Sequence, residues 1–244
     1  MIDQVRAEII KIRSTRTTIG LILGMLALTV TITLLSGLLQ HPRDISSVED
    51  QRQLLGIGSI AGLFSALAGV LVVTSEYRFG TIRPTFLVTP SWRRILGAKV
   101  MASFVSGVAF GVVGIGLSYA IGYLCLSGRN IPIALDGSDA ALLIVGSIGG
   151  SALFGAIGVG VGTIVRNQVG SVIALLAWGF VVESLLFALV PSVGRWTPGE
   201  AQNAMQGSTA DHLLSPGLGA LTMLVWVAAL AAIGIAWTSR RDVA

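Results

Sequence analysis

Charged residues are scarce in this chain. Of its 244 residues, 53% are hydrophobic and only 11% are Asp, Glu, Lys or Arg, whereas soluble proteins carry about 25% charged residues. So little charge cannot cover a water-exposed surface, and the composition therefore excludes an ordinary soluble domain. We expect residues 1–244 to form a single membrane domain of the all-α class.

Residue types that carry common enzymatic or metal chemistry are also rare. The one cysteine, Cys125, can form no internal disulfide. The two histidines, His41 and His212, are far apart in sequence, so we predict no metal site and no cofactor held by this chain. The two lysines, Lys11 and Lys99, are followed by Ile and Val. Neither therefore fits the G-x-x-x-x-G-K-[ST] loop that binds nucleotide phosphates, and we do not expect this chain to hydrolyse ATP alone.

Motifs of intramembrane catalysis are missing as well. Residues 149–152 read GGSA, which departs at its last position from the G-x-S-G of serine proteases in membranes. The sequence has no H-E-x-x-H and no pair of aspartates within an apolar run. We therefore do not expect an enzyme.

The apolar residues form six long runs. About 20 apolar residues in a helix cross the ~30 Å hydrocarbon core of a bilayer. The predicted spans are residues 17–39, 54–75, 100–126, 140–165, 168–190 and 214–238. The first run is too long for the apolar part of a signal peptide, so we expect it to be a retained helix. Three G-x-x-x-G pairs, beginning at Gly107, Gly146 and Gly158, predict close helix packing.

Basic residues predict the orientation of these spans. Twelve of the sixteen Lys and Arg fall on the side that receives both termini, the loop 76–99 and Arg166, and four fall on the other side. Loops rich in Lys and Arg stay in the cytoplasm. We therefore expect a multi-pass protein of the plasma membrane with both termini cytoplasmic. The same reasoning explains the pI near 9.8 without nucleic acid, which we do not expect as a partner.

The segment before the first span has the pattern of an interfacial helix. Ile2, Val5, Ile9 and Ile12 recur at spacings of three and four residues, which places them on one helix face. Basic residues lie mostly on the other faces. Residues 1–16 are therefore predicted to form an amphipathic helix lying in the membrane interface.

The loop between spans 5 and 6 carries a helix-start signal. Thr197, Pro198, Gly199 and Glu200 have the form of a capping box with proline in the first turn. Trp196, just before them, suits the interfacial zone of a membrane. A short outer helix is expected here.

Glu183 is an acidic residue inside the fifth apolar run, in its outer half. A charge at the centre of a membrane helix costs about 2.5–3.5 kcal/mol. Such a residue either forms part of a substrate pathway or makes a hydrogen bond between helices, and the sequence leaves both alternatives open.

The loop between spans 2 and 3 is the most distinctive segment, with the sequence EYRFGTIRPTFLVTPSWRR at residues 76–94. Gly80 is a natural helix stop, Pro84 can begin a short helix, and Thr89-Pro90 resembles the start of the next helix. Ile82, Phe86 and Leu87 would give the short helix an exposed apolar face among charged residues, which is how a docking site for a protein partner is built.

This loop resembles the cytoplasmic loop of ABC-2-type transporter permeases, which carries E-x-R-x-G-T-[IL] followed by P-x-[RW]-R and a lysine. The matching residues are Glu76, Arg78, Gly80, Thr81, Ile82, Pro90, Arg93, Arg94 and Lys99. The resemblance extends over the chain, from the interfacial helix through six spans to the outer helix.

The resemblance implies a coupling helix that docks on a separate ATPase subunit, which binds the ATP and Mg²⁺. The residues expected at this coupling site are Glu76, Arg78, Gly80, Thr81, Ile82, Arg83, Pro84, Phe86, Leu87 and Arg94. Six spans make half of such a transporter, so a second permease chain, identical or related, is expected. The family implies export, and the apolar spans favour a hydrophobic or amphipathic cargo such as a drug, an antibiotic or a lipid-like molecule. The alternative is a proton-coupled secondary transporter that uses Glu183, although no inverted repeat supports it.

Overall fold

The computed structural model describes residues 2–82, 84, 87 and 91–240, and within these ranges it contains helices and no strands. Its helices are α1 (Ile2–Ser14), α2 (Arg16–Leu39), α3 (Val48–Leu55), α4 (Ala61–Arg78), α6 (Trp92–Gly128), α7 (Gly137–Val165), α8 (Gln168–Ala177), α9 (Glu183–Leu189), α10 (Pro191–Gly194), α11 (Pro198–Met205) and α12 (Pro216–Arg240). Short 3₁₀ turns at Pro42–Ile45 and Gly56–Ile60 and a π-helical turn at Trp178–Val182 connect some of them.

Six helical segments are long and apolar enough to cross a membrane. They are Arg16–Leu39, Val48–Arg78, Trp92–Gly128, Gly137–Val165, Gln168–Leu189 and Pro216–Trp237. Each contains most of one predicted span, so the prediction of six helices long and apolar enough to cross a membrane is confirmed. The second and third are longer than the apolar runs because their helices continue through polar residues at the ends.

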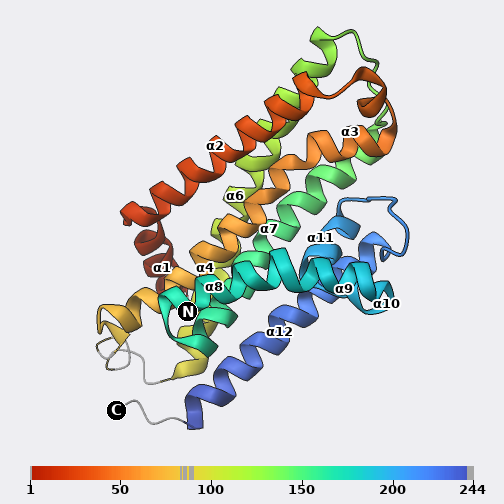
Figure 1. The fold of residues 1–244 in the computed structure, drawn as a ribbon. Helices are drawn as coiled ribbons and strands as arrows, with labels where there is room; N and C mark the ends of the chain where they lie inside the picture. The colour runs from red at the N-terminus through yellow and green to blue at the C-terminus, as the bar shows by residue number, and fades with distance from the viewer. Residues whose placement is uncertain (1, 83, 85–86, 88–90, 241–244) are drawn as a thin grey trace.

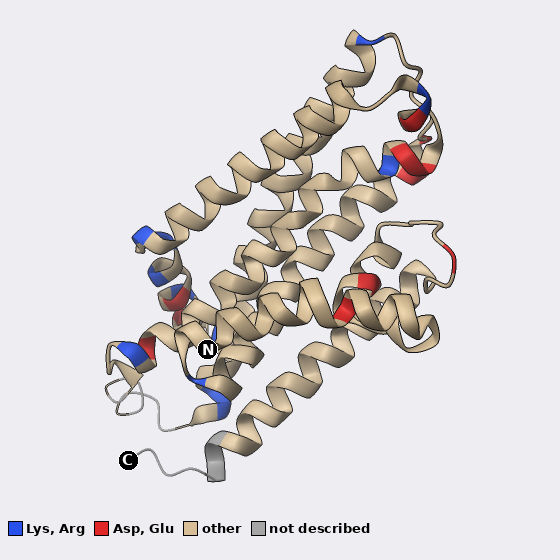
Figure 2. Ribbon diagram, in the orientation of Figure 1, with Lys and Arg blue, Asp and Glu red and all other residues tan. Residues whose placement is uncertain are grey.

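The helices form an elongated bundle (Figure 1). The axes of helices α2, α4, α6 and α7 are roughly aligned, and the chain runs up and down the bundle in successive helices. Helix α12 lies on the opposite side of α7 from α2. Charged residues gather at the two ends of the bundle, and few lie in its middle (Figure 2). We call one end the basic end; it holds α1, residues 79–82, the start of α6, the connection between α7 and α8, and the end of α12. The other is the acidic end; it holds the 3₁₀ turn Pro42–Ile45, α3, residues 129–139 and residues 190–215.

Glycines allow α4, α6 and α7 to form the centre of the bundle. A Cβ atom built on Gly158 would lie 2.0 Å from the Ala66 carbonyl oxygen, and one built on Gly107 would lie 2.6 Å from the Ser151 carbonyl oxygen. A Cβ on Gly146 would meet the backbone of Met205 at 2.2 Å. The helix backbones therefore approach closely at the predicted G-x-x-x-G pairs, as small residues permit in membrane proteins.

Three spans have apolar side chains on the outside. Only 6% of the Gln168–Leu189 span is buried, against 67% of Gly137–Val165. The spans formed by α2 and by α12 are also mostly exposed. These apolar faces lie on the surface of the isolated chain, where lipid or another membrane helix would cover them.

The two predicted short helices are present. Helix α1 covers residues 2–14 of the predicted 1–16, with Ile12 buried and Val5 and Ile9 partly buried, although Ile2 is exposed. Helix α11 begins at Pro198 as predicted, but the capping box is wrong. The Thr197 hydroxyl donates to the Gly194 carbonyl at 2.8 Å, and Glu200 accepts a hydrogen bond from the side chain of Asn203 at 3.1 Å. A different side chain caps this helix, as described below.

Candidate functional site

The candidate site lies at the basic end, where α4 ends and the chain turns toward α6. Helix α4 ends at Arg78, and Gly80 follows with φ +68°. This left-handed conformation is accessible to glycine and ends helices commonly, so the predicted helix stop is confirmed. Residues 82, 84 and 87 are helical. The predictions for Arg83, Phe86 and Thr89-Pro90 lie outside the described residues, and helix α6 begins at Trp92.

The apolar face predicted for this loop is only partly exposed. Leu87 is 87% exposed, as a docking residue should be, but Ile82 is only 8% exposed. The prediction that Ile82 is exposed is therefore wrong: it follows the turn at Gly80 so closely that its side chain stays within the protein. Thr81, Pro84 and Arg94 are exposed, and so is Arg78.

A network of four charged side chains lies where α4 ends and α6 begins. The Lys99 ammonium group lies 2.8 Å from Glu76 Oε1 and 3.0 Å from Glu8 Oε2. The Lys11 ammonium group lies 3.0 Å from the same Glu76 oxygen and 2.9 Å from Glu8 Oε1. The two carboxylates and the two ammonium groups carry no net charge. Lys99 also donates to the Val72 carbonyl oxygen at 3.3 Å.

The network is buried except on the Lys11 side. Lys99 is completely buried, Glu76 and Glu8 are 5% and 7% exposed, and the Lys11 side chain is 53% exposed. Burial alone would lower the pKa of Lys11, but hydrogen bonds and charge attraction from Glu8 and Glu76 outweigh it and raise that pKa above its ordinary value of 10.5. Lys11 therefore remains charged at neutral pH.

The network joins three helices. Glu8 and Lys11 come from α1, Glu76 from α4 and Lys99 from α6. Buried ion pairs fix geometry, because breaking one leaves an uncompensated charge in the interior. The ion pairs therefore hold α1, the end of α4 and the first turns of α6 against one another. Both carboxylates of this arrangement are engaged by ammonium groups.

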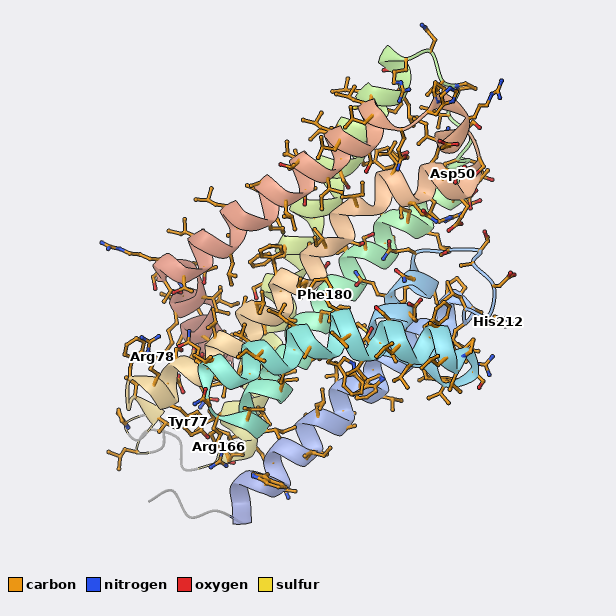
Figure 3. The ribbon with its side chains drawn as sticks, in the orientation of Figure 1. Asp50, Tyr77, Arg78, Arg166, Phe180 and His212 are labelled. Carbon is orange, nitrogen blue, oxygen red and sulfur yellow. The ribbon has the colours of Figure 1, made fainter. Side chains whose placement is uncertain are left out.

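Further contacts at the same end join α4 to the connection between α7 and α8. Arg78 donates to the Gln168 side chain at 3.1 Å, and the Arg166 guanidinium lies 5.5 Å from the centre of the Tyr77 ring. Figure 3 shows Tyr77, Arg78 and Arg166 together at the basic end. The connection between the fourth and fifth spans is thereby tied to the end of the second.

Glu183 is far from this network. Its side chain is 6% exposed, and its carboxylate accepts a hydrogen bond from the Gly199 backbone N–H at 2.8 Å. Gly199 is in the first turn of α11, where unpaired N–H groups and the helix dipole favour a negative charge. Glu183, from the fifth span, therefore caps α11 in place of Thr197. Of the two alternatives for Glu183, this geometry matches the hydrogen bond between helices.

Sequence reasoning found Glu76 and Lys99 through the loop motif but missed Glu8 and Lys11. The available signal was Glu8 itself, which falls between Val5 and Ile12 on the apolar face of α1. A lone carboxylate on such a face needs a cation from another element. The loop motif includes Lys99, which supplies this cation, but nothing in the sequence indicated that Glu8 and Lys99 would be in contact.

Among the described residues, no group of three or more His, Cys, Asp or Glu side chains could hold a metal ion. Comparison of the sequence with protein-family models and with curated proteins finds no match.

Proposed function

We propose that this chain is the membrane-spanning permease subunit of an ABC exporter, driven by a separate ATPase subunit that docks on residues 79–91. The observation that carries the proposal is the buried charge network of Glu8, Lys11, Glu76 and Lys99. It lies at the base of the loop that resembles a coupling helix. A loop that only fixes membrane topology needs exposed basic residues and no such buried network.

The network gives the loop the property that a coupling element requires. A force on the loop acts on α4 and α6, and the buried ion pairs prevent these two ends from separating. Glu8 carries the same displacement to α1. The close glycine contacts of α4 and α6 with α7 then pass it into the centre of the bundle. Loop and spans respond as a rigid lever when the ATPase subunits close on ATP and Mg²⁺.

A second permease chain completes the proposed transporter. The spans Gln168–Leu189 and Arg16–Leu39 have the largest unburied apolar faces, which suits contact with a partner helix or with lipid. Closure of the ATPase subunits would change access to a space between the two permeases. The basic end then faces the cytoplasm of a cell with this protein in its plasma membrane, in keeping with its Lys and Arg content.

The apolar spans favour an amphipathic or hydrophobic cargo such as a drug, an antibiotic or a lipid-like molecule. Glu183 is engaged with Gly199, so no observation favours the alternative of proton-coupled transport.

Co-expression with an ATPase encoded next to this chain tests the proposal. The complex should co-purify and hydrolyse ATP, and cargo export should depend on it. Glu76→Gln should leave the chain in the membrane but weaken the link between hydrolysis and export, because Lys99 and Lys11 both contact this carboxylate. Export that proceeds without any ATPase, and that Glu183→Gln abolishes, would instead establish proton-coupled transport.

A further inference from the structure

A partly open cleft at the acidic end is not explained by the function proposed above. It has a volume of about 420 Å³ and lies between α3 and the following turn on one side and α9, α11 and residues 206–213 on the other. Small-molecule sites occupy about 300–1,000 Å³. Figure 3 labels Asp50 on α3 and His212 in the loop, which mark the two segments on either side of it. The coupling site at the basic end does not involve it.

The lining of the cleft combines apolar and polar side chains. Ile57, Phe187 and Leu213 supply apolar surface. Gln53 and Asn203 supply exposed amide groups. A molecule that fits such a lining has an apolar body and one polar group.

The charges of the cleft favour a cation. Glu49 and Glu200 both line it, and Arg52 is the single basic side chain among its lining residues. The Arg52 guanidinium is already engaged: it lies 2.6 Å from Asp139 Oδ1 and donates to the Gln206 carbonyl oxygen at 2.9 Å. Glu49 is engaged as well, by Ser208 and Thr209.

Glu200 is the carboxylate that remains for a ligand. Among the described residues its side chain accepts one hydrogen bond, from Asn203. Phe187, on α9, lines the same cleft, and an aromatic ring attracts an organic cation placed over its face. A carboxylate and an aromatic ring that line the same cleft are suited to an ammonium group.

The surroundings reinforce this preference. The acidic end holds seven carboxylates and four arginines, which leaves three excess negative charges and attracts cations to the cleft (Figure 2). The carboxylates are Asp44, Glu49, Asp50, Asp136, Asp139, Glu200 and Asp211, and the arginines are Arg43, Arg52, Arg129 and Arg195.

We propose that this cleft binds an organic monocation with an apolar body, whose charged group lies between Glu200 and Phe187. The binding site itself does not depend on an ATPase. That the bound cation is cargo leaving the transporter rests on the function proposed above.

Binding to the full-length chain in nanodiscs tests the proposal. The probe is phenyltrimethylammonium, and its neutral isostere tert-butylbenzene is the control for apolar partitioning. Saturation-transfer NMR, with empty nanodiscs as the reference, should show saturable binding of the cation and binding of the isostere about tenfold weaker or less. Absence of saturable binding, or equal binding of both probes, would overturn the proposal.

Variants locate the site. Glu200→Gln should weaken cation binding about tenfold, whereas Asp44→Asn, which removes the same charge outside the cleft, should change it less than about twofold. Gln53→Lys places a positive charge on the exposed wall and should prevent binding even if Glu200→Gln fails to fold. If Gln53→Lys binds the cation as well as the wild type does, the site is not this cleft. Because no ATPase is present, these results are separate from any failure of coupling.

Discussion

Among substitutions in the charge network, we expect Lys99→Met to lower the free energy of unfolding the most. Methionine has nearly the length of lysine and keeps the apolar stem, so the substitution removes one charge with little change in volume. Glu8 and Glu76 then retain only Lys11, whose side chain is half exposed. The buried groups are left with one uncompensated negative charge.

The magnitude follows from this geometry. Removing one partner of a buried ion pair destabilises a protein by about 3–5 kcal/mol. Lys99 is completely buried and contacts both carboxylates within 3.0 Å, while Lys11 remains to neutralise one of them. We therefore expect the low end of the range, about 3 kcal/mol, or roughly a hundredfold in the folding equilibrium.

Unfolding in mixed micelles by added dodecyl sulfate, followed by the fluorescence of the five tryptophans, measures this change. Lys11→Met is the matched control: it removes the same charge from a half-exposed position and should cost under about 1 kcal/mol. In the Lys99→Met background, Glu8→Gln should be nearly neutral or stabilising, because it restores the balance of charge. If Lys99→Met lies within about 0.5 kcal/mol of wild type, the four groups do not act as a buried network.

Three further predictions concern other parts of the molecule. Because the pKa of Lys11 is raised in the folded state, its contribution to stability is complete below pH 10.5 and is lost as the pH rises through that higher pKa. Raising the pH above 10.5 should therefore lower the thermal denaturation midpoint of wild type more than that of Lys11→Met; parallel plots of midpoint against pH would contradict this. Gly158→Ala should destabilise the chain by about 2 kcal/mol or more, because its new methyl group would meet the Ala66 carbonyl oxygen. Gly116→Ala, whose methyl group would enter open space, should stabilise the chain by about 0.5–1 kcal/mol. Equal denaturation midpoints for the two variants would disprove the packing argument. Glu183→Leu leaves the Gly199 N–H without its acceptor and should raise amide exchange in the first turn of α11 about tenfold, while Glu183→Gln, which keeps an acceptor oxygen, should change it less.

The sequence predicts the helices well because their signals are local. A charge-free run of 20 or more residues can only be a membrane span or a buried core helix, and the interruptions of these runs fall where helices end. Gly80 and Pro198 are local signals as well: Gly80 follows the end of α4, and Pro198 begins α11. The longer extents of α6 and of the second span could not be predicted from hydropathy, because the added turns are polar and are stabilised by tertiary contacts.

The site was predictable only in part because it depends on contacts between distant residues. Glu8 and Lys99 are separated by 91 positions, and Glu183 and Gly199 by 16. Local rules predicted that Thr197 would cap α11, but a carboxylate from another helix caps it instead, at the Gly199 N–H. Ile82 was expected on the surface because its neighbours are polar, and only the path of the chain after Gly80 determines that it is buried.

The central claim is that residues 79–91 receive an ATPase subunit, and one pull-down experiment tests it most directly. The tagged chain is co-expressed with the ATPase encoded beside it, as wild type, as Leu87→Glu and as Ile133→Glu. Leu87 is 87% exposed on the loop, and Ile133 is a partly exposed apolar residue at the acidic end. We expect the ATPase to co-purify with wild type and with Ile133→Glu and to be lost from Leu87→Glu. An ATPase that fails to bind wild type, or that binds all three proteins equally, would contradict the account.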